Sequence, residues 1–129
     1  MTQEHKELLF KDLSARLPYH VRLKVWLKDG TTEEGFLDLK HNYGDVLRDA
    51  FYYNEIIDIK PYLFPLSSMT KEEWEDYQKI RMIDWVHGDI NGTFINAGLI
   101  VDWLNAHHFD YRGLIEKELA IDATNLNIY

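Results

Sequence analysis

The sequence predicts an α+β fold: a leading helix, a small and strongly bent antiparallel β-barrel, and a helical C-terminal segment packed on that barrel. Leucines at helical spacing open the chain, apolar and polar residues alternate over residues 21–28, and helical spacing returns after Thr70. A chain of 129 residues is long enough for one domain, or for two small modules that share a core. We expect two such modules, a helix with a barrel over residues 1–62 and a helical module over residues 63–129.

The first helix is expected over residues 5–17. Its apolar residues share one stripe at helical spacing: Leu9, Phe10, Leu13 and Leu17. Pro18 disfavours a helical conformation at the residue before it, so the helix should stop there. The segment "HVRLKVWLKDG" then alternates as a half-buried strand does, which turns these residues inward: Val21, Leu23, Val25 and Leu27.

Asp29 and Gly30 signal a hairpin after this strand. A two-residue turn would place two carboxylates among the inward side chains. A turn of about three residues, with Gly30 in the left-handed conformation, instead pairs Val21 with Leu37. Because a slip of one residue inverts every side chain of a strand, burial favours the longer turn.

Further short strands should complete the barrel. The second strand leads into a turn at "HNYG", a third strand around Val46 and Leu47, and a fourth strand in "YYNEIIDIKPYL" that ends before Pro61. Gly35 permits the bend that such a small barrel requires. The segment "PYLFPLSS" is the expected module boundary, and its apolar composition predicts that it packs on the surface.

Three helices are expected after this boundary. Thr70 and Glu73 have the spacing of a capping box for a helix in "TKEEWEDYQKI". Its inward candidates are Trp74, Tyr77 and Ile80. After the turn-rich "HGDINGTF", Asn96 is placed to cap a helix through "AGLIVDWLNAHH", and Asp110 to cap another through "YRGLIEKEL".

Composition and charge exclude several classes of protein. A hydrophobic share of 46% excludes intrinsic disorder, and the lack of Cys excludes a disulfide scaffold, a Cys-ligated zinc site and a thiol nucleophile. Residues 1–62 carry nine Lys and Arg against eleven Asp and Glu, a net charge of −2, whereas residues 63–129 carry five against eleven, a net charge of −6. No apolar run has the length of a membrane span, and no signal region opens the chain, so we expect a cytoplasmic protein without membrane contact.

The N-terminal half resembles an Sm-like barrel, the fold of small RNA-binding ring proteins, and more broadly SH3-like barrels. The resemblance covers about residues 5–62 and rests on "VRLKVWLKDG" followed by Gly30-x-x-x-x-Gly35-x-Leu37. His41 and Asp45 stand nearest to the positions where Sm-like proteins carry an Asp and an Asn that contact RNA, and "IIDIKP" lacks their later Arg-Gly element. The resemblance therefore implies the barrel architecture but not the RNA contacts.

The C-terminal half resembles an uncharacterised family of small proteins from gut Bacteroidales and their phages or mobile elements. Two strings carry this resemblance, "KPYLFPLSSMTKEEWEDY" and "DWLNAHHFDYRGLIEKELA". It implies a bacterial cytoplasm, including the setting of phage infection, and it brings no activity, cofactor or catalytic residue. In that family a Gly commonly stands at the position of Glu118, where it would end a helix with a left-handed cap.

His107, His108 and Asp110 are the candidate metal ligands. Adjacent histidines point in different directions on a helix, and the other four histidines lie far away in sequence, so the spacing does not support a zinc site. The alternative is that one histidine caps the C-terminal end of a helix and the other is a partly buried spacer. We expect the second arrangement, with this block as a tight seam between two helices and no bound metal.

The row Arg22, Lys24, Trp26 and Lys28 is the candidate binding surface. Three cations beside an indole on one strand face could hold phosphates and stack a base. In the alternative, Glu33 and Glu34 neutralise the row and the acidic C-terminal half docks over Trp26. We expect the docking.

The expected function is that of a non-enzymatic, protein-binding accessory factor of a phage or mobile element, because an acidic, aromatic-rich surface can engage basic patches on a partner. The first alternative is a divergent Sm-like nucleic-acid-binding module, which the net charge of −8 disfavours. The second is a His/Asp metal-binding protein. No reaction class can be assembled from the motifs present, so we expect neither catalysis nor a cofactor. The oligomeric state is left open.

Overall fold

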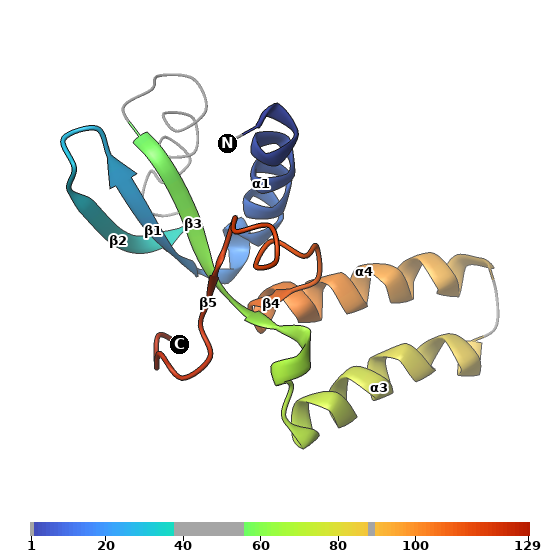
Figure 1. The fold of residues 1–129 in the computed structure, drawn as a ribbon. Helices are drawn as coiled ribbons and strands as arrows, with labels where there is room; N and C mark the ends of the chain where they lie inside the picture. Colours follow the sequence, from blue (N-terminus) through green and yellow to red (C-terminus); the bar gives the residue numbers. More distant parts are fainter. Residues whose placement is uncertain (1, 38–55, 88–89) are drawn as a thin grey trace.

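A mixed, open β-sheet forms the centre of the molecule in the computed structural model, which describes residues 2–37, 56–87 and 90–129 (Figure 1). The strand order is β2-β1-β3-β4, and β5 also pairs with β3. The strands are β1 (Val21–Leu27), β2 (Thr32–Leu37), β3 (Ile56–Pro65), β4 (Phe109–Asp110) and β5 (Ile121–Asp122). The predicted α+β class and the leading helix are confirmed, whereas the described strands do not close into a barrel.

The first helix, α1 (Gln3–Arg16), packs on the sheet through the predicted leucines. Thr2 caps it, because its hydroxyl accepts a hydrogen bond from the His5 amide at 3.1 Å. Leu9 and Leu13 are fully buried, but Phe10 is 45% exposed and does not belong to the buried stripe. A 3₁₀ turn (Leu17–Tyr19) follows α1 directly, so the helix ends beside Pro18 as predicted.

The predicted hairpin register between β1 and β2 is confirmed. Val21 lies opposite Leu37 and Leu23 lies opposite Gly35. The turn spans three residues between Leu27 and Thr31, whose carbonyl accepts from the Leu27 amide at 2.9 Å. Gly30 has φ +88°, the left-handed conformation that this turn requires. Burial of the β1 residues Val21, Leu23 and Val25 therefore sets the register.

Strand β3 is longer than predicted, because it continues through Pro61 to Pro65. Its first part pairs with β1 in antiparallel fashion, and Pro61 is the last residue of that register, opposite Leu23. Beyond this point β3 leaves β1 and pairs in parallel with β4 and β5. A proline is tolerated where one ladder ends and the strand changes partners. The expected turn at "HNYG" and the expected strand around Val46 and Leu47 lie outside the described residues.

Helices α3 (Lys71–His87) and α4 (Ile90–Ala106) form an antiparallel hairpin that extends away from the sheet (Figure 1). The predicted capping box is confirmed: the Thr70 amide donates to Glu73 Oε1 at 3.0 Å, and the Glu73 amide donates to Thr70 Oγ1 at 3.1 Å. The expected start near Asn96 is wrong, because α4 begins at Ile90. The C-terminal end of α4 contacts α1 and β4. Among the described residues, no helix has the length and hydrophobicity to cross a membrane.

The third predicted C-terminal helix is wrong. Residues 111–120 form a series of turns, in which Gly113 and Glu118 have positive φ values of 73° and 60°. A left-handed residue interrupts a helix, which explains the difference. These turns insert Leu114, Leu119 and Ala120 into the same apolar core as Leu9, Leu13, Val21, Leu23, Val25, Leu37, Ile59 and Leu63. Residues from both sides of the expected boundary at residue 62 thus share one core, and the boundary itself falls within β3.

Candidate functional site

The two histidines at the end of α4 serve different structural roles. The His107 ring stacks on Trp103 with a centroid distance of 4.1 Å, and its Nδ1 lies 2.9 Å from the Trp103 carbonyl oxygen. It therefore caps the helix end, as expected for one of the pair. His108 has φ +61° and stacks on the Tyr129 ring at 3.7 Å. Burial, together with the nearby positive charge of Arg16, lowers the pKa of His108 to about 4.

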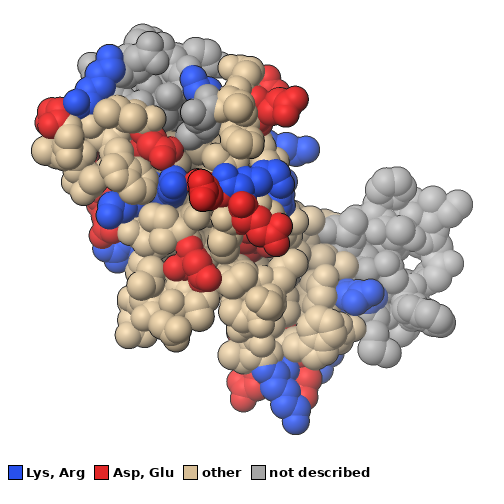
Figure 2. Space-filling view, viewed as in Figure 1, with Lys and Arg blue, Asp and Glu red and all other residues tan. Residues whose placement is uncertain are grey.

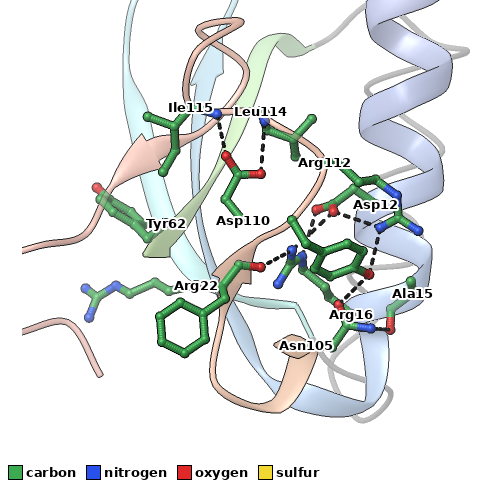
Figure 3. Close-up of polar contacts among 12 residues, drawn as sticks. Asp12, Ala15, Arg16, Arg22, Tyr62, Asn105, Asp110, Arg112, Leu114 and Ile115 are labelled. Carbon is green, nitrogen blue, oxygen red and sulfur yellow. Dashed lines mark hydrogen bonds and ion pairs between the residues drawn. The ribbon is translucent and has the colours of Figure 1, made fainter. Parts of the chain in front are cut away.

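The Asp110 carboxylate is used by the turn that follows it. Its two oxygens accept hydrogen bonds from the amides of Leu114 and Ile115, each at 2.9 Å (Figure 3). Asp110 therefore accepts hydrogen bonds from the amides that follow it, as predicted for a capping residue, although no helix follows. Within the described ranges, no group of three or more His, Asp or Glu side chains is placed to hold a metal ion. His107 and Asp110 form hydrogen bonds within the chain, and His108 stacks on Tyr129.

A buried ionic cluster, which the sequence reasoning missed, joins α1 to this corner. Asp12 and Arg16 are both fully buried, and Arg16 Nε donates to Asp12 at 2.8 Å. Arg112 reaches the same carboxylate at 3.0 Å, and the second Arg16 nitrogen donates to the Phe109 carbonyl at 2.7 Å (Figure 3). The i, i+4 spacing of Asp12 and Arg16 on the face that carries Leu9 and Leu13 was the available signal.

The outer face of the sheet gathers only part of the predicted basic row. Arg22 forms an ion pair with Glu34 at 3.2 Å, as expected for a neutralised position, and Glu34 also accepts a hydrogen bond from the Tyr62 hydroxyl. This hydrogen bond is the main cause that lowers the pKa of Glu34, while burial and the same bond raise the pKa of Tyr62 to about 12. Lys28 lies in the exposed turn after β1. Arg22 and Lys28 therefore differ in their surroundings from Lys24, which lies beside Trp26.

Trp26 is partly exposed and lies between two lysines. Lys24 Nζ is 5.4 Å from the indole centroid, and Lys60 Nζ, from β3, is 5.7 Å from it. The expected docking of the C-terminal helices over Trp26 is not found, since Trp26 lies near the C-terminal end of β1 and the α3–α4 hairpin extends from the other end of the sheet (Figure 1). Lys60 was missed because the pairing of β1 with β3 could not be predicted.

A row of aromatic rings crosses the base of the α3–α4 hairpin. Trp74 packs on Tyr77 with a centroid distance of 5.9 Å, and Tyr77 packs on Trp103 at 5.8 Å. Together with His107, which stacks on Trp103, these rings form what we name the aromatic strip. Trp74 was expected to point inward, but it is 50% exposed, and its indole packs on Tyr77 of the same helix. The strip is the larger of the two aromatic surfaces described.

One further pocket of about 420 Å³ lies beside β3. Its charged lining residues are two lysines and two carboxylates: Asp58, Lys60, Lys117 and Glu118. This balance of charge favours no single class of ligand.

Comparison with known proteins adds no relative to this picture: no family model, no curated protein and no solved structure matches the chain.

Proposed function

We propose that this protein is a non-enzymatic protein-binding factor that acts in the bacterial cytoplasm for a phage, another mobile element or the host. The aromatic strip of Trp74, Tyr77, Trp103 and His107 is the observation that supports it. The strip lies on the helical hairpin that extends away from the sheet, and Trp74, the last ring of the strip, is half exposed. A contiguous exposed apolar surface with a polar rim marks an interaction site, and the strip is the candidate for such a surface.

The base of the hairpin, where α3 begins, combines uncharged surface with a charged margin. Figure 2 shows an uncharged stretch of surface where Figure 1 places the 3₁₀ turn Leu66–Ser68 and the hairpin base, with charged side chains gathered at the start of α3. Leu66, which is 45% exposed, adds apolar surface in this 3₁₀ turn. An apolar centre with charges at its margin is the usual anatomy of a binding site for another protein, and Trp is enriched among the residues that dominate such interfaces.

Charge indicates the kind of partner. The whole chain has a net charge of −8, and residues 63–129, which contain the hairpin, contribute −6 of it. The first turn of α3 contains Glu72 and Glu73, both near the amide end of the helix. Complementary potentials steer association, so the partner is a protein that presents an apolar side chain flanked by Lys and Arg. The proposal is non-enzymatic because the sequence motifs assemble no reaction class, and because His107 and Asp110 form hydrogen bonds within the chain.

The test begins with affinity capture from host cells, followed by identification and purification of the captured protein. The purified pair is then titrated with wild type, Trp74→Ala and Phe10→Ala. Truncation of an interface Trp typically costs about 2 kcal/mol or more, so Trp74→Ala should weaken binding by about thirtyfold. Phe10→Ala removes a ring of similar exposure from α1 and should change the affinity by less than about threefold. Equal affinities of wild type and Trp74→Ala would exclude the aromatic strip as the binding surface.

A further inference from the structure

The register of the sheet places two lysines and one indole together on its outer face. Lys24 of β1 lies opposite Lys60 of β3, and Trp26 follows two residues after Lys24 on the same side of β1. Both ammonium groups lie within 6 Å of the indole centroid, at 5.4 and 5.7 Å. We name Lys24, Trp26 and Lys60 the lysine–indole site. It differs from the row visible in the sequence, because one of its cations comes from a different strand.

The nearby carboxylates do not fully neutralise this site. Glu34 lies opposite Lys24 in the β1–β2 register, but its carboxylate is bound by Arg22 and by the Tyr62 hydroxyl. Asp58 lies opposite Trp26 in the β1–β3 register, accepts a hydrogen bond from the Ile59 amide at 2.9 Å and forms a long ion pair with Lys60 at 4.0 Å. Two like charges opposite each other on neighbouring strands repel. An anion bound between Lys24 and Lys60 relieves this repulsion, so the site favours a negatively charged ligand.

The indole narrows the class of anion. Lysines beside an aromatic ring suit a ligand that carries both a phosphate and a flat, unpaired base. Each nucleotide of a single-stranded nucleic acid carries both groups. A duplex offers no free base face, and the net charge of −8 opposes long contacts with a phosphate backbone. From this juxtaposition we propose that the lysine–indole site binds single-stranded nucleic acid, with a base on Trp26 and the flanking phosphates at Lys24 and Lys60.

The site is separate from the aromatic strip, so this inference does not depend on the proposed protein partner. Trp26 lies near the C-terminal end of β1, whereas the hairpin that carries Trp74 extends from the opposite end of the sheet (Figure 1). A variant at either surface should therefore leave binding at the other unchanged. This separation allows the two proposals to fail independently.

The test is a titration of fluorescently labelled oligouridylate and oligothymidylate with the full chain, over a series of salt concentrations. Wild type should bind, and its affinity should fall as salt rises. The double variant Lys24→Glu/Lys60→Glu should bind at least about tenfold more weakly, because both proposed phosphate contacts are lost. Two lost phosphate contacts on a single strand, each worth about 0.7 in the slope of log K against log salt, should reduce that slope by about 1.4.

Two controls distinguish a specific site from a general charge effect or misfolding. Lys79→Glu makes the same kind of charge change at an exposed lysine of α3 and should leave oligonucleotide affinity within about twofold of wild type. Trp26→Phe keeps an aromatic ring and should retain more affinity than Trp26→Ala, with circular dichroism confirming that both variants are folded. The ratio of the two affinities measures the preference of the site between oligouridylate and oligothymidylate.

Three results would overturn this inference. The first is that wild type binds neither oligonucleotide at low ionic strength. The second is that Lys79→Glu weakens binding as much as Lys24→Glu/Lys60→Glu. The third is that the double variant loses the captured protein partner while oligonucleotides never bind, which would make this face a protein contact.

Discussion

Asp12→Ala should destabilise the fold more than any surface substitution, because Asp12 is the carboxylate that balances two guanidinium groups. Asp12 and Arg16 are fully buried, and Asp12 accepts from Arg16 Nε at 2.8 Å and from Arg112 at 3.0 Å. The substitution leaves the Arg16 guanidinium buried, with the Phe109 carbonyl at 2.7 Å as its remaining acceptor. Removal of one partner of a buried ion pair costs about 3–5 kcal/mol, a large part of a typical unfolding free energy of about 5–15 kcal/mol.

Urea unfolding, followed by tryptophan fluorescence and far-ultraviolet circular dichroism, measures this cost. Glu7→Ala removes an exposed carboxylate from the same helix and should stay within about 0.5 kcal/mol of wild type. Arg112 is partly exposed, so Arg112→Ala should cost less than Asp12→Ala. If Asp12→Ala does not fold, Asp12→Asn, which keeps an acceptor oxygen, should fold with reduced stability. A loss below about 1 kcal/mol for Asp12→Ala would refute the role of the cluster.

Three further predictions concern the C-terminal turns and the residues that pack on them. Glu118→Gly should raise the unfolding free energy by up to about 1 kcal/mol. It relieves the strain of a left-handed non-glycine residue, about 1–2 kcal/mol, but glycine loses about 0.5–1 kcal/mol more conformational entropy on folding. A lower melting temperature of the variant would contradict this prediction. The pKa of His108 is lowered to about 4 in the folded chain, so between about pH 6.5 and pH 4 the unfolded chain binds the extra proton and wild type loses stability as the pH falls. His108→Asn, which tolerates the left-handed conformation, should lose less stability over that range, and parallel pH profiles of the two urea midpoints would rule this out. Tyr129→Phe removes a hydroxyl that donates to the Tyr62 carbonyl at 2.8 Å and accepts from the Arg22 amide at 2.7 Å. The substitution should lower the unfolding free energy by about 2 kcal/mol and speed hydrogen exchange of the Arg22 amide. Unchanged exchange at that amide would contradict the prediction.

The features that could be predicted from sequence are those with a local cause. The β1–β2 register follows from the alternation over Val21–Leu27 and from the left-handed Gly30, all within one hairpin. The capping box of Thr70 and Glu73 likewise involves residues three positions apart. In both cases the interacting groups lie close enough in the chain for spacing alone to identify them.

The features that were missed depend on contacts between distant segments. Strand β3 continues past Pro61 because its last residues pair with the strands that contain Phe109 and Ile121. The local sequence pattern around Pro61 does not predict this pairing. The expected helix after Asp110 had a capping residue and leucines at helical spacing, yet Gly113 and Glu118 are left-handed and the segment turns into the core instead. Tertiary packing outweighs helix propensity in a segment this short.

The candidate sites show the same division. Lys24 and Trp26 could be placed on one strand face from alternation, but Lys60 could not be added without the β1–β3 register. Trp74 has the spacing of an inward residue of α3, and it is exposed because this helix packs on α4 at the end of the sheet. Helical spacing identifies a shared face, but it does not determine which neighbour covers that face.

The most direct test of the account is calorimetric titration of the purified captured partner into three forms of the protein: wild type, Trp74→Ala and Lys24→Glu/Lys60→Glu. If the hairpin binds the protein partner, Trp74→Ala should lose about thirtyfold in affinity while the double lysine variant binds as wild type does. Full affinity of Trp74→Ala, with binding lost in the double lysine variant, would contradict it.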